Sequence, residues 1–312
     1  MTRRCSLQEA PSCTPVAACT GPARPDVVHM AQEHFTAPEP IVCKWCGSKD
    51  VMKYGTRKGV QEYICVTCHR KFRPKDSPAG MRFTVEQIGT ALTMYYGGQS
   101  LSIIAETLRE TQKLHVNPVS VYRWILRYTK AAIAATDPLI LKHSTRWAVD
   151  ETVILVGGKN LWFWDIIDDR SRFLIATHLS RVRTIKDVIL VMEQAKRKVG
   201  GIAPDAITSD RLAAYDDGIE RVFGADSRHI HSFGFTDELN NNLIERFHGA
   251  IKQRTKVMRG FKRSETALLI LRGFLVNYNY FRPHMGLKGE TPAEVAGVQR
   301  PFENWLDVVR KA

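Results

Sequence analysis

The sequence contains none of the long apolar stretches that would place it in or across a membrane. No apolar run approaches the roughly 20 residues that a helix needs to span a bilayer, and the first 30 residues lack the continuous apolar core of a secretory signal. Compositional extremes are missing as well, since 44% hydrophobic and 25% charged residues are ordinary for a globular protein. These absences exclude an integral membrane protein, a fibrous protein and a globally disordered chain. They predict a soluble, cytoplasmic protein.

Acidic residues are scarce, because 32 Asp and Glu stand against 45 Lys and Arg and leave a net charge of +13. The excess lies in two segments, 41–83 and 243–290, each with 10 basic and 3 acidic side chains. Two basic segments on an otherwise near-neutral chain favour a polyanionic partner, either a nucleic acid or an anionic membrane surface. The alternative is that both segments are solvated faces without a partner.

Four of the seven cysteines have the spacing of a metal site. Two C-x2-C pairs are separated by 18 residues: Cys43, Cys46, Cys65 and Cys68. Each pair fits a tight turn, and four thiolates complete the tetrahedral coordination of structural Zn²⁺. His69 follows the last cysteine and could substitute as a ligand, although the four cysteines suffice. We predict a zinc ribbon over 41–76, in which Zn²⁺ holds together a segment too small to have its own core.

Residues 1–40 differ from the rest of the chain in composition and lack a regular pattern of apolar residues. They are rich in Ala, Pro and Thr, show no sustained periodicity, and include the other three cysteines, Cys5, Cys13 and Cys19. We therefore expect a disordered tail. Met30 begins a more ordinary stretch, and translation that starts at Met30 is a hypothesis that mass spectrometry of the native N-terminus would test.

Three short helical patterns follow the predicted ribbon and a linker rich in Pro and Gly. In the first, Thr84 and Gln87 have the spacing of a capping box, and Gly97-Gly98 provides the stop. The second pattern starts at Ser100, and the third follows Asn117-Pro118.

Two short helices followed by a third with polar residues on one face are the outline of a helix-turn-helix. We predict such a DNA-binding domain over 82–135, with Arg123 and Arg127 of the third helix as candidate DNA contacts. An ordinary small helical bundle is the alternative, since helical patterning alone does not exclude it.

The central region changes to the period of strands. Three β-branched and aromatic runs, TRWAVDETVILVGG, LWFWDIIDD and RFLIATHLS, predict three sequential antiparallel strands. They are followed by a helix, the short strand DAITSD, a second helix, the strand-like SRHIHS and a long helix that begins near Thr236. This order predicts an α/β fold in which a mixed sheet has helices on its faces.

Three carboxylates stand out by their positions in that fold. Asp150 falls inside the first strand, where a charge in an apolar run is costly unless it is paired or liganded. Asp210 falls at the end of the fourth strand, where α/β sheets commonly place functional groups. Glu245 borders the apolar stripe of the last long helix. The three could converge on divalent ions, because hard oxygen ligands suit Mg²⁺, whereas each taken singly is an ordinary surface acid.

Other polar residues near these acids are weaker candidates. Glu151 should point to the opposite face of the sheet from Asp150 if the strand is regular. A turn-forming role is expected for Asp165, Asp168 and Asp169, which lie in or near a turn. We expect core or rim positions for two residues that precede the last long helix, His229 and His231.

The acids and the motifs around them resemble a known family. There are 59 residues between Asp150 and Asp210 and 34 between Asp210 and Glu245, within the segments WAVDET, ITSD and NNNLIERFHGAIKQRTKVMRGFK. Together with NYNYFRPHMGLKGETPAEV, these segments are similar to DDE transposases of prokaryotic insertion sequences, most of all to the insertion sequence six family. The resemblance covers 140–298. It implies a ribonuclease-H-like, retroviral-integrase-like catalytic domain there, followed by a C-terminal tail at 299–312.

The resemblance also implies an activity, which is cleavage of transposon DNA ends and strand transfer into target DNA. Asp150, Asp210 and Glu245 would hold catalytic Mg²⁺ (or Mn²⁺) for two-metal phosphoryl transfer, and Lys252 would contact a phosphate near the transposon end. Implied partners are double-stranded DNA, as terminal inverted repeats and target, and further copies of the chain in a homodimer or higher multimer. A nucleoid-associated location without membrane contact follows.

Two alternatives to this activity stay open. One is a non-catalytic DNA-binding regulator derived from a transposase, which would use only the zinc ribbon and the helix-turn-helix. The other is a ribonuclease-H-like nuclease without strand transfer.

Overall fold

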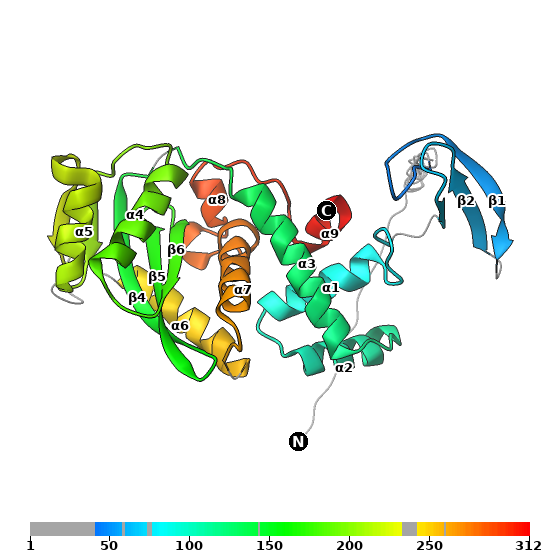
Figure 1. Cartoon of the computed structure of the whole chain (residues 1–312), viewed down its shortest axis with the longest axis horizontal. Helices are drawn as coiled ribbons and strands as arrows, with labels where there is room; N and C mark the ends of the chain where they lie inside the picture. Colours follow the sequence, from blue (N-terminus) through cyan, green and yellow to red (C-terminus); the bar gives the residue numbers. More distant parts are fainter. Residues whose placement is uncertain (1–40, 58–59, 74–76, 143, 233–241, 259) are drawn as a thin grey trace, which may run out of the picture. The chain divides into compact units, whose positions relative to one another are not determined.

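The structure, a computed structural model, describes residues 41–312 except 58–59, 74–76, 143, 233–241 and 259. Val42–Ala312 form one unit, and Figure 1 labels most of its helices and strands. The tail expected at 1–40, with Met30, lies outside the described residues. No helix in the described part of the chain is both long and apolar enough to cross a membrane.

A small three-stranded antiparallel sheet follows the first cysteine pair. Its strands lie in the order β1-β2-β3: β1 (Val51–Arg57), β2 (Val60–Cys65) and β3 (Lys71–Phe72). Tyr63 stacks on Phe72 with ring centroids 6.0 Å apart, and the buried apolar residues of this sheet and its loops are Cys43, Cys65 and Phe72. So few buried side chains cannot supply a core, which agrees with the predicted need for a metal.

Three helices occupy the region predicted to be helical: α1 (Val85–Tyr96), α2 (Leu101–Gln112) and α3 (Pro118–Thr136). The predicted capping box of α1 is confirmed, because the Thr84 side chain accepts from Gln87 N at 3.2 Å and the Gln87 side chain accepts from Thr84 N at 3.0 Å. Ser100 caps α2, and Asn117 caps α3 with Pro118 in the first turn. The three helices are therefore confirmed, while their use as a helix-turn-helix stays a prediction.

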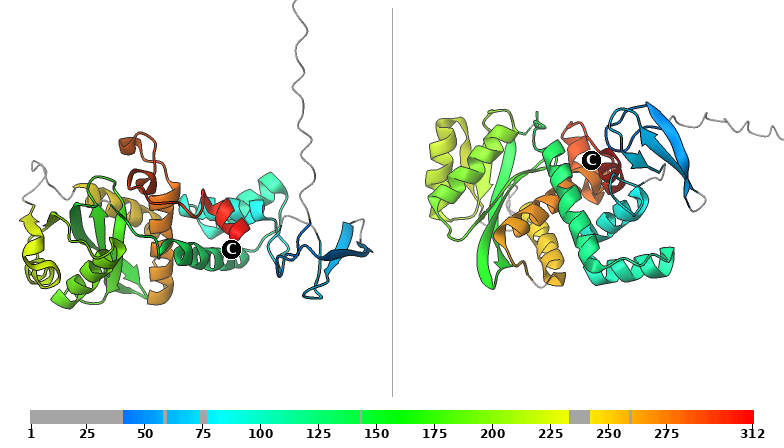
Figure 2. Two further views of the ribbon diagram at one scale, coloured as in Figure 1. Left: turned by 90° about the horizontal axis from the view of Figure 1, so that it is seen from above. Right: turned by 45° about the vertical axis from the view of Figure 1, so that its right-hand side comes forward.

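The second sheet is mixed and five-stranded, in the order β6-β5-β4-β7-β8. Figure 1 labels its strands β4, β5 and β6, and Figure 2 shows the same ribbon from two other sides. Its strands are β4 (Arg146–Val156), β5 (Lys159–Asp168), β6 (Leu174–Ser180), β7 (Ala206–Ser209) and β8 (Arg228–His231). The first three are antiparallel neighbours, whereas β7 pairs parallel with β4, and β8 pairs parallel with β7. The predicted order of elements is confirmed, with α4 (Ile185–Lys198), α5 (Ala213–Phe223) and α6 (Asn242–Val257) in the expected places. A 3-10 turn (Gly224–Asp226), which was not predicted, lies between α5 and β8. The start near Thr236 that we expected for α6 falls in 233–241, outside the described residues.

Helices α5 and α6 contact opposite faces of this sheet. The Trp164 ring of β5 packs edge-on against Tyr215 of α5, with centroids 5.8 Å apart, whereas the next residue, Asp165, contacts His248 of α6. Since successive residues of a strand point to opposite faces, the sheet lies between the two helices. Gly218 lets α5 approach α4, because a Cβ at this position would lie 2.5 Å from the Val188 side chain.

The last part of the chain folds back onto earlier elements. It comprises α7 (Ser264–Val276), a π-helical turn (Asn277–Phe281), a 3-10 turn (Met285–Leu287), α8 (Pro292–Val295) and α9 (Trp305–Lys311). Trp305 is 1% exposed, stacks on Tyr96 of α1 with ring centroids 4.4 Å apart, and donates to Asn277 Oδ1 at 2.9 Å.

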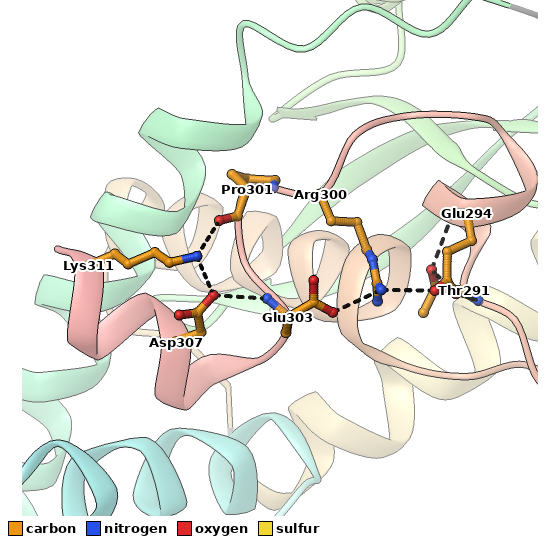
Figure 3. A network of polar contacts seen from close by, with 7 residues as sticks. All are labelled: Thr291, Glu294, Arg300, Pro301, Glu303, Asp307 and Lys311. Carbon is orange, nitrogen blue, oxygen red and sulfur yellow. Dashed lines mark hydrogen bonds and ion pairs between the residues drawn. The ribbon is translucent and has the colours of Figure 1, made fainter. Parts of the chain in front are cut away.

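Ion pairs connect charged side chains within this terminal segment (Figure 3). Arg300 bridges Glu294 and Glu303 at 2.9 and 2.8 Å, and Lys311 pairs with Asp307 at 2.7 Å. The stretch at 299–312, expected as a tail, therefore contains an ordered helix with a buried tryptophan. Within the single unit Val42–Ala312, our predicted domain boundaries stay predictions.

Candidate active site and metal centre

The four cysteines converge as their spacing predicts. Sulfur atoms of Cys43 and Cys68 lie 3.6 Å apart, those of Cys46 and Cys65 lie 3.5 Å apart, and all four fall within 4.8 Å of one another. In a tetrahedral site with Zn–S bonds of about 2.3 Å, the sulfur atoms are about 3.8 Å apart. The cluster is therefore consistent with zinc.

Both cysteine pairs are shaped by the residue that follows them. Gly47 and His69 have φ of +73° and +56°, and their amides donate to the carbonyls of Cys43 and Cys65 at 2.9 and 3.0 Å. These two similar turns bring each pair of thiols to the same point. His69 is exposed and lies outside the sulfur cluster, so the four cysteines form the donor set without it.

A second group of possible ligands lies in the five-stranded sheet. Oxygen atoms of Asp150, Glu151 and Asp210 fall within 4.8 Å of one another. The register of the parallel strands β4 and β7 explains why Asp150 and Asp210 lie close together. Ala148 pairs with Thr208, so the residues two positions further along, Asp150 and Asp210, lie side by side. The Asp210 carboxylate also accepts from Leu212 N at 2.9 Å just before α5 begins.

Asp150 is linked to a buried histidine and a second aspartate. His248 of α6 lies with Nδ1 3.5 Å from Asp150 and Nε2 3.1 Å from Asp165, and its side chain is 5% exposed. Burial alone would lower the pKa of His248, but the hydrogen bonds and charges of Asp150 and Asp165 outweigh it and raise the pKa to about 9. The raised pKa favours the protonated form of His248 between Asp150 and Asp165, while burial raises the pKa of Asp165 as well.

The role we expected for Asp165 in a turn is wrong. Asp165 lies within β5, is 0% exposed and pairs in register with Asp150, because the antiparallel β4–β5 ladder places the two residues opposite each other. The expectation is correct for Asp168, whose Oδ2 accepts from Ser171 N at 2.7 Å and from Ser171 Oγ at 2.6 Å.

Glu151 faces the side of the sheet that carries α5, as the alternation of the strand predicts. Its two carboxylate oxygens accept from Arg183 at 2.7 Å and from the Tyr215 hydroxyl at 2.6 Å. Burial raises the pKa of Glu151, and these two hydrogen bonds oppose that rise. Although the two residues are successive in the strand, an oxygen of the Glu151 carboxylate lies within 4.8 Å of oxygens of both Asp150 and Asp210.

Glu245 lies in the first turn of α6 and is exposed. The group of three convergent carboxylates in the described residues does not include it. His248, three residues later on α6, contacts Asp150, and residues three apart share one face of a helix. Glu245 thus lies one helical turn before a residue that contacts Asp150, while its place in a triad stays a prediction.

The predicted DNA contacts are exposed and lie on helices. Lys252 projects from α6, and Arg123 and Arg127 project from α3. Farther along α6, Arg254 donates to the carbonyl of Gly97 at the end of α1, where a cation complements the exposed carbonyls of a helix terminus. These positions leave the three predicted residues accessible to a ligand.

The sequence patterns did not indicate three site residues: His248, Tyr215 and Arg183. Their partners lie 83, 64 and 32 residues away in the chain, so no local pattern reveals the contacts. The one available signal is that His248 follows Glu245 by a single helical turn.

A family model described as a DDE domain matches residues 144–284. Residues 144–284 form a DDE transposase domain. The DDE domain contains the whole five-stranded sheet and α4 to α7, and with them Asp150, Asp210, Glu245 and His248.

The relatives that match more than half of the chain include the following two proteins. An uncharacterized protein from Methanocaldococcus jannaschii is 21% identical over 193 residues, which are 61% of this chain and 83% of that protein. The transposase for insertion sequence-like element IS431mec from Staphylococcus aureus is 24% identical over 205 residues, which are 65% of this chain and 89% of that protein.

Matches among solved structures are more distant in sequence. The catalytic core domain of HTLV-2 integrase in complex with magnesium is 17% identical with a TM-score of 0.39, over 50% of this chain and 99% of that one. The simian T-cell lymphotropic virus intasome is 13% identical with a TM-score of 0.41, over 69% of this chain and 77% of that one.

The bridge that His248 forms between Asp150 and Asp165 should stabilise the fold. We expect His248→Ala to lower the free energy of unfolding by about 3–5 kcal/mol, because it leaves the fully buried Asp165 as an uncompensated charge. Chemical denaturation in Mg²⁺-free buffer measures the loss. The double variant Asp165→Asn/His248→Ala should recover part of it, and equal stability of His248→Ala and wild type would contradict the bridge.

The bridge also predicts how the stability contributed by His248 changes with pH. Because the pKa of His248 is raised in the folded state from 6.5 to about 9, its contribution is complete below pH 6.5 and disappears as the pH rises through 9. The stability difference between wild type and His248→Ala should therefore shrink between pH 6.5 and 9.

Proposed function

We propose that the protein is a DDE transposase that cleaves transposon DNA ends and transfers the strands into target DNA. The observation that carries the proposal is the meeting of Asp150 and Asp210 at one sheet edge inside the DDE domain, with carboxylate oxygens within 4.8 Å. The relative IS431mec transposase, which this chain matches over 89% of its length, supports the same activity. We further propose that the mixed sheet and its helices belong to the ribonuclease-H-like fold.

The donor set suits hard divalent cations. Asp150, Asp210 and Glu245 offer anionic oxygens, the ligands that Mg²⁺ and Mn²⁺ prefer. When bound, such ions activate a water or a DNA 3′-hydroxyl and stabilise the leaving oxygen. Asp150 is oriented for this role by His248, whose other nitrogen is anchored on Asp165. The buried His248 and Asp165 thus hold the Asp150 carboxylate in a fixed orientation.

Charged surfaces on other elements supply the binding that this chemistry requires. Lys252 on α6 would contact a phosphate near the transposon end, and Arg123 and Arg127 on α3 would bind the duplex within a helix-turn-helix. The four-cysteine ribbon would hold structural Zn²⁺ and present its own basic residues to the backbone. Joining two ends requires two sites, so we propose a homodimer or higher multimer as the active form.

The test is an assay of nicking and joining on DNA that flanks the gene. Purified full-length protein is incubated with duplexes of both flanks, with Mg²⁺ and in metal-free buffer, and products are resolved on denaturing gels. Mg²⁺-dependent nicking followed by joining supports the transposase. Nicking without joining would identify a nuclease, and gel-shift binding without cleavage on any flank would identify a DNA-binding regulator.

A further inference from the structure

A cluster of two histidines and an aspartate lies beside the proposed active site. His229 Nδ1 and His231 Nε2 lie 3.0 and 3.1 Å from the same oxygen, Oδ1 of Asp216. The three side chains are among the groups in the described residues whose potential ligand atoms fall within 4.8 Å of one another. We had expected these histidines to be core or rim residues, and neither the DDE chemistry nor the zinc ribbon uses them.

The fold builds this cluster from two elements. His229 and His231 are two residues apart in β8, so both project from one face of the strand. Asp216 lies in the first turn of α5, which places its carboxylate over that face. The side chains of His229, His231 and Asp216 are 16%, 37% and 50% exposed, so solvent reaches the point where the three meet.

Hydrogen bonding determines which nitrogen of His229 is free to bind. The Ser209 hydroxyl has one proton, and it donates that proton to the Asp210 carbonyl at 2.8 Å. In the tautomer of His229 that fits this donation, the ring N–H donates the 2.7 Å contact from Nε2 to Ser209 Oγ. In the neutral imidazole, Nδ1 then presents a lone pair to the Asp216 carboxylate at 3.0 Å. Two lone pairs at this distance repel each other unless a proton or a metal ion lies between them.

From this arrangement we propose that Asp216, His229 and His231 bind a divalent ion of the zinc class, such as Zn²⁺, Co²⁺ or Ni²⁺. Imidazole nitrogen selects these ions over Mg²⁺, which prefers oxygen ligands alone. Metal–nitrogen and metal–oxygen bonds of about 2.0–2.1 Å place neighbouring donor atoms about 2.9–3.4 Å apart, which the distances of 3.0 and 3.1 Å match. Three protein ligands leave room for water to complete the coordination.

The site is tied to the proposed catalytic centre through Ser209. His229 Nε2 bonds Ser209 Oγ, and Ser209 Oγ bonds the backbone carbonyl of Asp210. Ligated histidines commonly donate their second N–H to an oxygen in this way. A bound ion would therefore stiffen the end of β7 at the residue that carries a proposed catalytic carboxylate.

The experiment is a zinc stoichiometry on the full chain. Wild-type protein is equilibrated with micromolar free Zn²⁺, separated from unbound metal and analysed by elemental mass spectrometry. We expect two zinc ions per chain, one in the four-cysteine cluster and one here. His231→Ala and Asp216→Asn, which alter partly exposed side chains, should each retain one, whereas His115→Ala, at an exposed position outside every cluster, should retain two.

Two further measurements separate this site from the others. Asp150→Asn/Asp210→Asn should still bind two zinc ions; a loss of one would place the second ion at the acidic cluster and overturn the proposal. Zn²⁺ should also raise the Tm of wild type more than that of His231→Ala, because a ligand that binds only the folded chain stabilises it. One zinc per wild-type chain, or two in both His231→Ala and Asp216→Asn, would overturn the proposal as well.

Discussion

Asp150→Asn and Asp210→Asn are each expected to lower the rate of DNA cleavage and joining by at least about 10³-fold. A catalytic metal ion supplies several kcal/mol of transition-state stabilisation, and each 1.4 kcal/mol corresponds to a factor of ten in rate. An amide keeps the shape of the side chain but loses the negative charge that holds a divalent ion. Strand-cleavage kinetics measure the loss, and gel shifts in the same buffer should show unchanged DNA binding.

Glu151→Gln and Glu245→Gln determine which acid is the third ligand. Both oxygens of Glu151 already accept hydrogen bonds, from Arg183 and Tyr215, so we assign this residue a structural role. We therefore expect Glu151→Gln to keep most of the activity at some cost in stability, and Glu245→Gln to be as inactive as the aspartate variants. The opposite result, an active Glu245→Gln and an inactive Glu151→Gln, would replace Glu245 by Glu151 in the catalytic set. Full activity of Asp150→Asn would remove the proposed mechanism.

Local chemistry explains which parts of the fold could be predicted from the sequence. Thr84, Ser100 and Asn117 cap the helices that they were expected to start, because capping depends on residues two or three positions away. Each pair of cysteines likewise depends on neighbouring residues, since each pair occupies one turn. The order of strands and helices also follows from periodicities within single segments.

Contacts between distant segments explain what the sequence did not reveal. Asp165 was misjudged because its role depends on the register of β4 and β5, which no neighbouring residue encodes. His248 reads as one more polar residue of an amphipathic helix until α6 is packed against Asp150 and Asp165. Trp305 belongs to a segment without strong periodicity, and it becomes ordered by stacking on Tyr96 more than 200 residues earlier. Sequence patterns predicted the acids Asp150 and Asp210, but not the residues that support them.

Loss of a single zinc ligand is expected to unfold the ribbon and weaken DNA binding. The free energy of zinc binding is the folding free energy of such a segment, and the small sheet buries only Cys43, Cys65 and Phe72 as apolar residues. We expect Cys65→Ser to lose one zinc ion per chain and to expose the ribbon to limited proteolysis. Several basic residues of the ribbon are exposed and available for phosphates: Lys49, Lys53, Arg57, Arg70 and Lys71. Their loss as an ordered surface should lower DNA affinity by about 10- to 10³-fold and reduce its dependence on salt.

His69→Asn is the matched control for that variant. Asparagine tolerates the positive φ of +56° at this position, and the exposed His69 ring is outside the sulfur cluster, so zinc content and DNA affinity should both stay unchanged. If His69→Asn lost zinc while Cys65→Ser retained it, the donor set would be three cysteines and a histidine. If Cys65→Ser lost zinc but bound DNA with wild-type affinity and salt dependence, the basic residues of the ribbon would have no part in binding. DNA recognition would then rest on α3 and α6, and zinc would serve only the fold of the ribbon.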